Sequence, residues 1–226
     1  IGDYQTPLPS EQLSVIAWNT NNTLHVFYRS KDMRVRELYK KPNHKWRTTD
    51  ILAVSNAVWE DRYKPSRPLK AFCWEANNTI HIFFRGTDKK IYELYKKKDK
   101  QWRITDILDV SRGQPPKPIG QLSVTYSYNP HAMHIYYRSS SNELHEIYKK
   151  QDKPWKHTPI SQIADGEPLK QSNLLQSDPQ GHYCSVFYIG QDGHIHMFEK
   201  VDQADQWSHC DLTWDSRALG IDQFDK

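Results

Sequence analysis

Short apolar runs with an alternating or aromatic-rich pattern recur along the chain and predict β-strands joined by tight turns. One example is the stretch LHVFYRSKDMRVRELYKK, which begins at Leu24. Two similar stretches, IHIFFRGTDKKIYELYKK and MHIYYRSSSNELHEIYKK, begin at Ile80 and Met133. Runs of about five to eight residues around a polar turn are typical of antiparallel strands and not of helices.

These stretches belong to a larger unit that occurs four times, approximately over residues 11–52, 68–108, 121–161 and 173–213. Each unit predicts four short strands, and connectors rich in Pro, Gly and Ser, such as DVSRGQPPKPIG, separate the units. A tandem unit of about 40 to 50 residues with four strands is typical of a β-propeller blade. We therefore predict an all-β fold in which residues 1–226 form a single β-propeller domain of four tandem four-stranded antiparallel blades. The alternative is part of a larger ring that another chain completes.

The turn between the second and third strands reads SKDMR, GTDKK, SSSNE and GQDGH in the four units. Asn142 and Gly193 occupy one equivalent position, which favours a left-handed backbone there. Met33 and Lys89 occupy the same position in the first two units, at a small conformational cost.

Four residue types recur at fixed spacing within the first three units. They are His25, Arg29, Glu37 and Trp46, then His81, Arg85, Glu93 and Trp102, then His134, Arg138, Glu146 and Trp155. The equivalents in the fourth unit are Ser185, Ile189, Met197 and Trp207. The His, Arg and Glu are therefore lost as a set, whereas the Trp is kept.

Two interpretations of this set compete. In the first, Arg and Glu form a partly buried cross-strand ion pair with His packed beside it, so that both charges are kept or lost together. In the second, the set lines a cleft between blades, where Arg and Glu bind sugar hydroxyls by charge-assisted hydrogen bonds and a Trp or Tyr stacks on the sugar. The fourth cleft would then be inactive.

The pattern HVFYRSKDMRVRELY…W resembles the repeats of the fungal and bacterial fucose-specific lectins of the β-propeller class, and the resemblance covers all four units. It implies that Glu37, Glu93 and Glu146 bind sugar hydroxyls and that Trp46, Trp102 and Trp155 contact the sugar. His25, His81 and His134 occupy the position of the family's Arg, and the Arg of this chain lies four residues later. Either His replaces Arg as a hydrogen-bond donor, or the specificity differs from fucose. The family usually has six blades.

Composition excludes several other classes. A charged fraction of 26% with no long apolar run argues against a membrane-spanning chain. The net charge of +4 is too small to indicate nucleic-acid binding by itself. Three cysteines without metal-ligand spacing favour a reducing compartment slightly. The chain begins at Ile1 and carries no readable signal segment, so the sequence does not choose between a cytoplasmic and a secreted protein.

Weaker signals have an ordinary structural explanation beside a functional one. The hairpins KKPNHKW, KKKDKQW and KKQDKPW are basic and could attract anionic glycans, lipid or nucleic acid, but lysines also prevent strand edges from pairing. His194 and His196 have the spacing of a metal-binding pair, yet no third ligand is evident in the sequence, and we expect an ordinary role.

The sequence contains no nucleophile elbow, phosphate-binding loop or zinc-protease motif, so we expect no enzyme, no cofactor and no metal. Our main prediction is a multivalent lectin for glycans or glycoproteins, with fucose as one candidate sugar and homo-oligomerisation as an open question. A propeller that binds a protein partner is the alternative, and a glycoside hydrolase is a third, weaker one.

Overall fold

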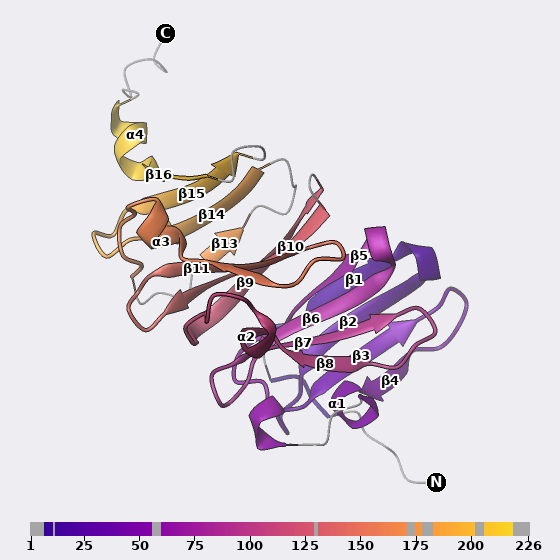
Figure 1. Cartoon of the computed structure of the whole chain (residues 1–226). Coiled ribbons are helices and arrows are strands. Elements are labelled where there is room, and N and C mark those ends of the chain that lie inside the picture. Colours follow the sequence, from indigo (N-terminus) through magenta and orange to yellow (C-terminus); the bar gives the residue numbers. More distant parts are fainter. Residues whose placement is uncertain are drawn as a thin grey trace. The chain divides into compact units, whose positions relative to one another are not determined.

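The computed structural model of the chain describes residues 7–10, 12–55, 60–128, 131–170, 175–177, 183–201 and 206–218. These residues form four antiparallel sheets of four strands, and each sheet follows the order of its strands along the chain (Figure 1). The all-β prediction and the four-stranded antiparallel units are confirmed. The chain divides into two compact units, Ile1–Val110 and Ser111–Lys226, each with two sheets.

The first unit contains sheets 1 and 2. The strands of sheet 1 are β1 (Ser14–Trp18), β2 (Thr23–Arg29), β3 (Val35–Lys40) and β4 (Arg47–Asp50). Those of sheet 2 are β5 (Lys70–Trp74), β6 (Thr79–Arg85), β7 (Ile91–Lys97) and β8 (Arg103–Asp106).

The second unit contains sheets 3 and 4. The strands of sheet 3 are β9 (Pro118–Tyr128), β10 (His131–Ser139), β11 (Leu144–Lys150) and β12 (Lys156–Thr158). Those of sheet 4 are β13 (Leu175–Ser177), β14 (Tyr183–Ile189), β15 (Ile195–Val201) and β16 (Trp207–Asp211).

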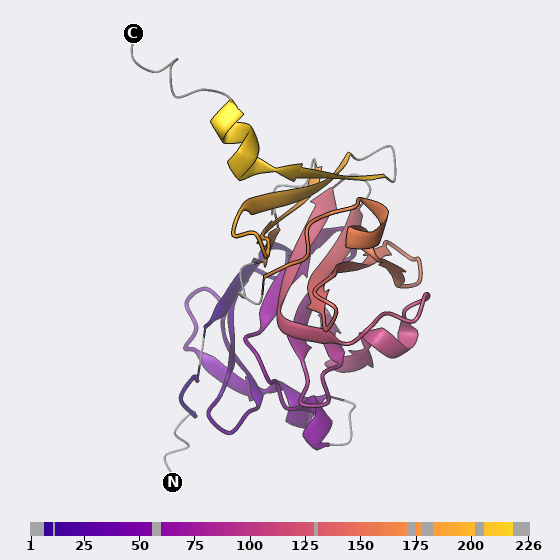
Figure 2. The ribbon, with the colours of Figure 1, turned by 90° about the vertical axis from the view of Figure 1, so that its left-hand side faces the viewer.

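A short helix follows the fourth strand of every sheet. These helices are α1 (Ile51–Val54), α2 (Ile107–Val110), α3 (Ile160–Ile163) and α4 (Leu212–Ala218), the last of which continues directly from β16 (Figure 2). The short 3-10 helices are η1 (Asn19–Asn21), η2 (Asp61–Tyr63) and η3 (Glu75–Asn77). The carboxylate of Asp50 accepts a hydrogen bond of 3.2 Å from the backbone N–H of Ala53, which caps α1. A helix of four residues is too short to leave a periodic pattern, which is why the sequence did not reveal α1 to α3.

The predicted left-handed position between the second and third strands is confirmed in all four sheets. The φ angles there are 59° at Met33, 66° at Lys89, 63° at Asn142 and 87° at Gly193. Each of these turns is closed by a backbone hydrogen bond; in sheet 1 the N–H of Ser30 donates to the carbonyl of Arg34 over 3.0 Å. The turns therefore fix the register of the second and third strands.

Each unit has a core that both of its sheets contribute to. In the first unit, the ring of Trp102 packs edge-on against Phe27, with centroids 6.1 Å apart. In the second unit, Trp207 packs in the same way against Tyr136, also at 6.1 Å. The Trp that precedes or begins the fourth strand of one sheet thus covers the second strand of the sheet before it. No helix within the described residues is long and apolar enough to cross a membrane.

Candidate functional site

A buried pair of one histidine and one glutamate recurs in sheets 1, 2 and 3. The His Nδ1 atom lies 2.7 Å from the Glu Oε1 atom in His25–Glu37, 2.6 Å in His81–Glu93 and 2.7 Å in His134–Glu146. No glutamate of these pairs is more than 3% exposed. Removing one member of a buried ion pair leaves an uncompensated group and is strongly destabilising. The pairs therefore belong to the architecture of each sheet.

A hydroxyl group completes each pair at the other nitrogen of the imidazole. The Nε2 atom of His25 lies 2.7 Å from Oγ1 of Thr23, and that of His81 lies 2.6 Å from Oγ1 of Thr79. Sheet 3 has Ala132 at the equivalent place, and Ser127 on the neighbouring strand supplies the hydroxyl instead, at 2.9 Å from His134. Both nitrogens of each histidine are thus engaged within the protein.

Aromatic rings flank each histidine on the face of its sheet. The ring of His25 stacks against Phe27 and against Tyr39, with centroids 5.9 Å away in both pairs. In sheet 3, His134 stacks in the same way against Tyr136 and against Tyr148, at 6.1 Å. These rings exclude water from the pair and hold the imidazole plane in place.

The partner of the glutamate is the histidine and not the arginine, so the expected Arg–Glu ion pair is wrong for these residues. Arg29 instead donates from Nε to Oγ of Ser10 over 2.9 Å and from Nη1 to the carbonyl of Pro65 over 3.2 Å. Arg138 donates to Oδ1 of Asn142 over 2.6 Å. Arg29 therefore holds the chain segments that precede sheets 1 and 2, and Arg138 holds its own turn.

This correction also changes how the loss of the set in sheet 4 is understood. Ser185 and Met197 stand in place of the histidine and the glutamate, so the two members of the buried pair are lost together, as a paired interaction requires. Ile189 replaces an arginine that takes no part in the pair. Its loss is a separate change.

The imidazole of His134 has an additional neighbour, because Sγ of Cys184 in sheet 4 lies 3.7 Å from its Nε2 atom. Burial alone would lower the pKa of His134, but the hydrogen bond to Cys184 and the carboxylate of Glu146 raise it to about 9. His134 and Glu146 therefore form an ion pair at neutral pH. The second oxygen of Glu146, Oε2, is buried without a hydrogen-bond partner among the described residues.

A pocket of about 440 Å³ lies between sheets 1 and 2. Its lining brings together His25, Glu37 and Tyr39 of sheet 1 with Lys96 and Trp102 of sheet 2. The pocket thus joins the buried pair of one sheet to the tryptophan of the next. Neither Arg29 nor Trp46 is part of its lining.

Lysines give the mouth of this pocket a positive charge. The Nζ atom of Lys96 lies 5.8 Å from the centre of the Trp102 ring, within the range of a cation–π contact. Lys41 and Lys100 also line the pocket, beside the single exposed carboxylate of Asp99. Sequence reasoning placed these lysines on exposed hairpins and did not connect them with the His–Glu pair.

The second unit repeats this arrangement between sheets 3 and 4. Lys200 takes the position of Lys96, and its Nζ atom lies 5.3 Å from the Tyr148 ring centre and 5.9 Å from that of Trp207. Together with His134 and Glu146, these residues occupy the positions equivalent to those that line the pocket of the first unit.

The four repeated tryptophans differ in exposure. Trp46 is 48% exposed, whereas Trp102, Trp155 and Trp207 are buried. Trp102 and Trp207 each cover the preceding sheet of their own unit, as described above. Trp46 precedes the fourth strand of the first sheet in the chain, and about half of it faces solvent.

No model of a protein family matches the chain, and no curated protein matches it at a significant level. Its fold is similar to solved lectin structures. AofleA from Arthrobotrys oligospora superposes with a TM-score of 0.61 at 14% identity, over 88% of this chain and 55% of that one. The lectin of Aleuria aurantia, described as a six-bladed β-propeller, superposes with a TM-score of 0.57 at 15% identity, over 88% and 62% of the two chains.

A third similar structure is the lectin BP39L from Burkholderia pseudomallei, with a TM-score of 0.55 at 13% identity over 88% of this chain and 54% of the other. The chain thus spans between about half and two thirds of the length of these lectins. The resemblance found in the sequence repeats is confirmed by neighbours that are β-propeller lectins. At 13–15% sequence identity, the similarity to these structures concerns the fold alone.

Proposed function

We propose that this protein is a multivalent carbohydrate-binding lectin whose sugar sites lie between the two sheets of each unit. The observation that carries the proposal is the pocket of about 440 Å³ where Glu37 of one sheet meets Tyr39, Lys96 and Trp102. A pocket with aromatic walls and a few fixed polar groups is the kind of site that takes a small polar ligand with an apolar face. One similar structure is that of an Aleuria aurantia lectin mutant in complex with alpha-methyl-L-fucoside, and fucosylated glycans are therefore the first ligands to examine.

We assign different roles to the members of the pair. Both nitrogens of His25 are engaged by Glu37 and Thr23, so His25 orients the carboxylate and does not itself reach a sugar. Glu37 accepts a hydrogen bond from a sugar hydroxyl, and the nearby lysine Lys96 donates one. The predicted donor role of Arg29, Arg85 and Arg138 stays a prediction.

We further infer that the four sheets are consecutive blades of one β-propeller domain and that another chain completes a larger ring. The six-bladed ring of the Aleuria aurantia lectin and the coverage of 62% of its length support a ring larger than four blades. Trp102 and Trp207 each cover the sheet that precedes their own, whereas the ring of Trp46 is exposed. This difference supports a further blade beside sheet 1 that Trp46 would cover. A four-bladed ring closed within the chain is the alternative.

A protein-binding propeller is the second candidate function. The buried His–Glu pairs are consistent with this function, because their contribution to stability explains them without a ligand. Under this hypothesis the basic hairpins bind an acidic protein surface, and free sugars have no effect.

Glycan-array binding of the parent protein beside two variants tests the proposal. Lys96→Met removes the donor at the pocket, and Lys97→Met is the matched control because adjacent strand residues point to opposite faces. Fucosylated hits that weaken in Lys96→Met and persist in Lys97→Met would support the proposal. Hits from another sugar class with the same response would retain the site and exclude fucose. No glycan bound by any of the three proteins would exclude the lectin function.

A further inference from the structure

One corner of each sheet, formed by the turn after the second strand and the end of the fourth, collects charged side chains in sheets 1, 2 and 4. Two aspartates recur there: Asp32 and Asp50 in sheet 1, Asp88 and Asp106 in sheet 2, and Asp192 and Asp211 in sheet 4. Sheet 3 has Ser141 and Pro159 at these places. Two neighbouring carboxylates repel each other and need a cation between them.

In sheets 1 and 2, arginine or lysine side chains pair with aspartates of this corner. In sheet 1, Nε of Arg34 lies 3.0 Å from Asp50, and Nη2 of Arg36 lies 2.8 Å from Asp32. In sheet 2, Nζ of Lys90 lies 2.7 Å from Asp106, whereas Asp88 accepts a hydrogen bond of 2.7 Å from the hydroxyl of Tyr92. These cations are charged at every physiological pH.

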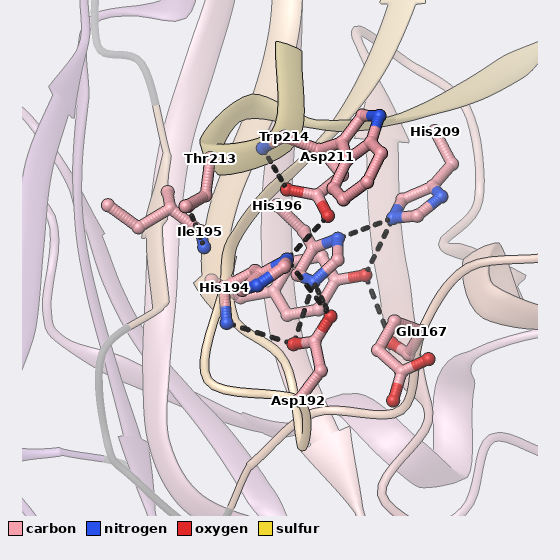
Figure 3. A network of polar contacts seen from close by, with 10 residues as sticks. Glu167, Asp192, His194, Ile195, His196, His209, Asp211, Thr213 and Trp214 are labelled. Atoms are coloured by element: carbon pink, nitrogen blue, oxygen red, sulfur yellow. Dashed lines mark hydrogen bonds and ion pairs between the residues drawn. The ribbon is translucent and has the colours of Figure 1, made fainter. Parts of the chain in front are cut away.

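Sheet 4 has histidines at the two arginine positions of sheet 1. His194 replaces Arg34 and His196 replaces Arg36. The Nδ1 atom of His194 lies 2.7 Å from Oδ2 of Asp211 and 3.5 Å from Oδ2 of Asp192. Figure 3 shows these three side chains converging from the turn and from the end of β16. The permanent cation of the other corners is thus replaced by a side chain that binds metal ions.

We propose that Asp192, His194 and Asp211 bind a divalent transition-metal ion, with Zn²⁺ as the best match. One ligand atom from each residue lies within 4.8 Å of the others. Tetrahedral ligands at about 2.0–2.1 Å from zinc are about 3.3 Å apart, so the two distances from His194 need only small adjustments. Three protein ligands leave a fourth position for water, and a mixed imidazole and carboxylate set favours zinc over calcium or magnesium.

A second layer of hydrogen bonds orients one of the proposed ligands. The Nε2 atom of His196 lies 3.1 Å from both carboxylate oxygens of Asp192, and its Nδ1 atom lies 3.1 Å from Nε2 of His209. Partners of this kind are usual around metal ligands.

The proposed site is accessible and has a structural consequence. The side chains of Asp192, His194 and Asp211 are 35%, 27% and 25% exposed, so an ion can reach them from solvent. The other oxygen of Asp211 accepts a hydrogen bond of 2.9 Å from the backbone N–H of Trp214 and so caps α4. A metal ion bound here would fasten the start of α4 to the turn between β14 and β15.

The test uses untagged, metal-stripped protein titrated with Zn²⁺ and, for its visible spectrum, with Co²⁺. We expect one ion per chain, the absorption bands of a low-coordinate Co²⁺ site, and a rise in the Tm of the sheets when Zn²⁺ is added. His194→Lys recreates the corner of sheet 2 and should weaken binding at least about 100-fold, because loss of an outer partner alone costs about 10–100-fold. Asp211→Asn should weaken binding too while it keeps a good cap for α4.

His157→Gln is the control, since His157 and His145 form a separate pair, 3.0 Å apart, in sheet 3. The variant should bind Zn²⁺ as the parent does. The proposal is overturned by an absence of saturable binding, by binding that persists in His194→Lys, or by binding that is lost in His157→Gln.

Discussion

The Nδ1 atom of His81 lies 2.6 Å from Oε1 of Glu93, although the two residues are diagonal neighbours and not direct partners across β6 and β7. Phe83 stands directly opposite Glu93. The buried carboxylate of Glu93 thus pairs with the imidazole of a diagonal neighbour. Removing either residue leaves the other buried without its partner.

Replacing Glu93 alone should therefore cost more than replacing both members. We expect Glu93→Met to lower the free energy of unfolding by about 3–5 kcal/mol, because it leaves His81 buried without its carboxylate. The double variant His81→Ser with Glu93→Met copies the residues of sheet 4 and should recover most of this loss. Urea denaturation of the three proteins measures the difference. Equal stability of the single and double variants would contradict a paired role.

The stability of the second unit should fall as the pH rises above neutrality. The pKa of His134 is raised to about 9 in the folded protein, against about 6.5 when unfolded. A raised pKa gives stability that is complete below pH 6.5 and is lost as the pH approaches 9, here roughly 3 kcal/mol. Denaturation at pH 6.5 and pH 9 checks this. His134→Gln, less stable overall, should show a smaller change between these pH values.

A second histidine should limit stability on the acid side. Burial and, to a smaller extent, the adjacent His157 together lower the pKa of His145 to about 4. A depressed histidine pKa gives stability that is present above pH 6.5 and is lost as the pH falls towards 4. We expect the Tm to decrease between pH 6.5 and pH 4.5, and less so in His145→Phe. An identical decrease in that variant would assign the acid sensitivity to other groups.

The repeated tryptophans should respond differently to truncation. Trp102→Ala removes a buried ring that packs against Phe27 and should lower the free energy of unfolding by about 3–5 kcal/mol. Trp46→Ala removes an exposed ring and should change the stability of the monomer little. If a second copy completes the ring, Trp46→Ala should instead weaken self-association, which light scattering after gel filtration can measure. A parent protein that is monomeric at all concentrations would exclude ring completion by a second copy.

The sequence was sufficient for the strands and turns because these follow local patterns. The position held by Met33 and Gly193 was assigned a left-handed backbone from its residues in the four repeats, and the φ angles agree. The residue that pairs with the glutamate could not be predicted from local patterns. Glu37 stands opposite Phe27, so His25 and Arg29 are both its diagonal neighbours, and spacing cannot choose between them.

Contacts between sheets were also beyond the sequence. The repeat assigns one tryptophan to each unit but does not tell which sheet the ring covers, and Trp102 proved to complete the pocket of the preceding sheet. The cluster around His194 was missed for a related reason. Asp211 lies 17 residues further along the chain and reaches His194 only because β15 and β16 pair.

The pocket between sheets 1 and 2 is lined by residues of two successive repeats. A repeat thus supplies one four-stranded sheet, but no single repeat supplies the whole pocket. Duplicating one repeat within the gene adds a whole pocket only if the new copy and its neighbour still match across their shared boundary. Selection on such a gene would act on the contacts between neighbouring repeats. The fourth repeat can therefore lose its own His–Glu pair and still keep Trp207, because that ring covers the sheet of the third repeat.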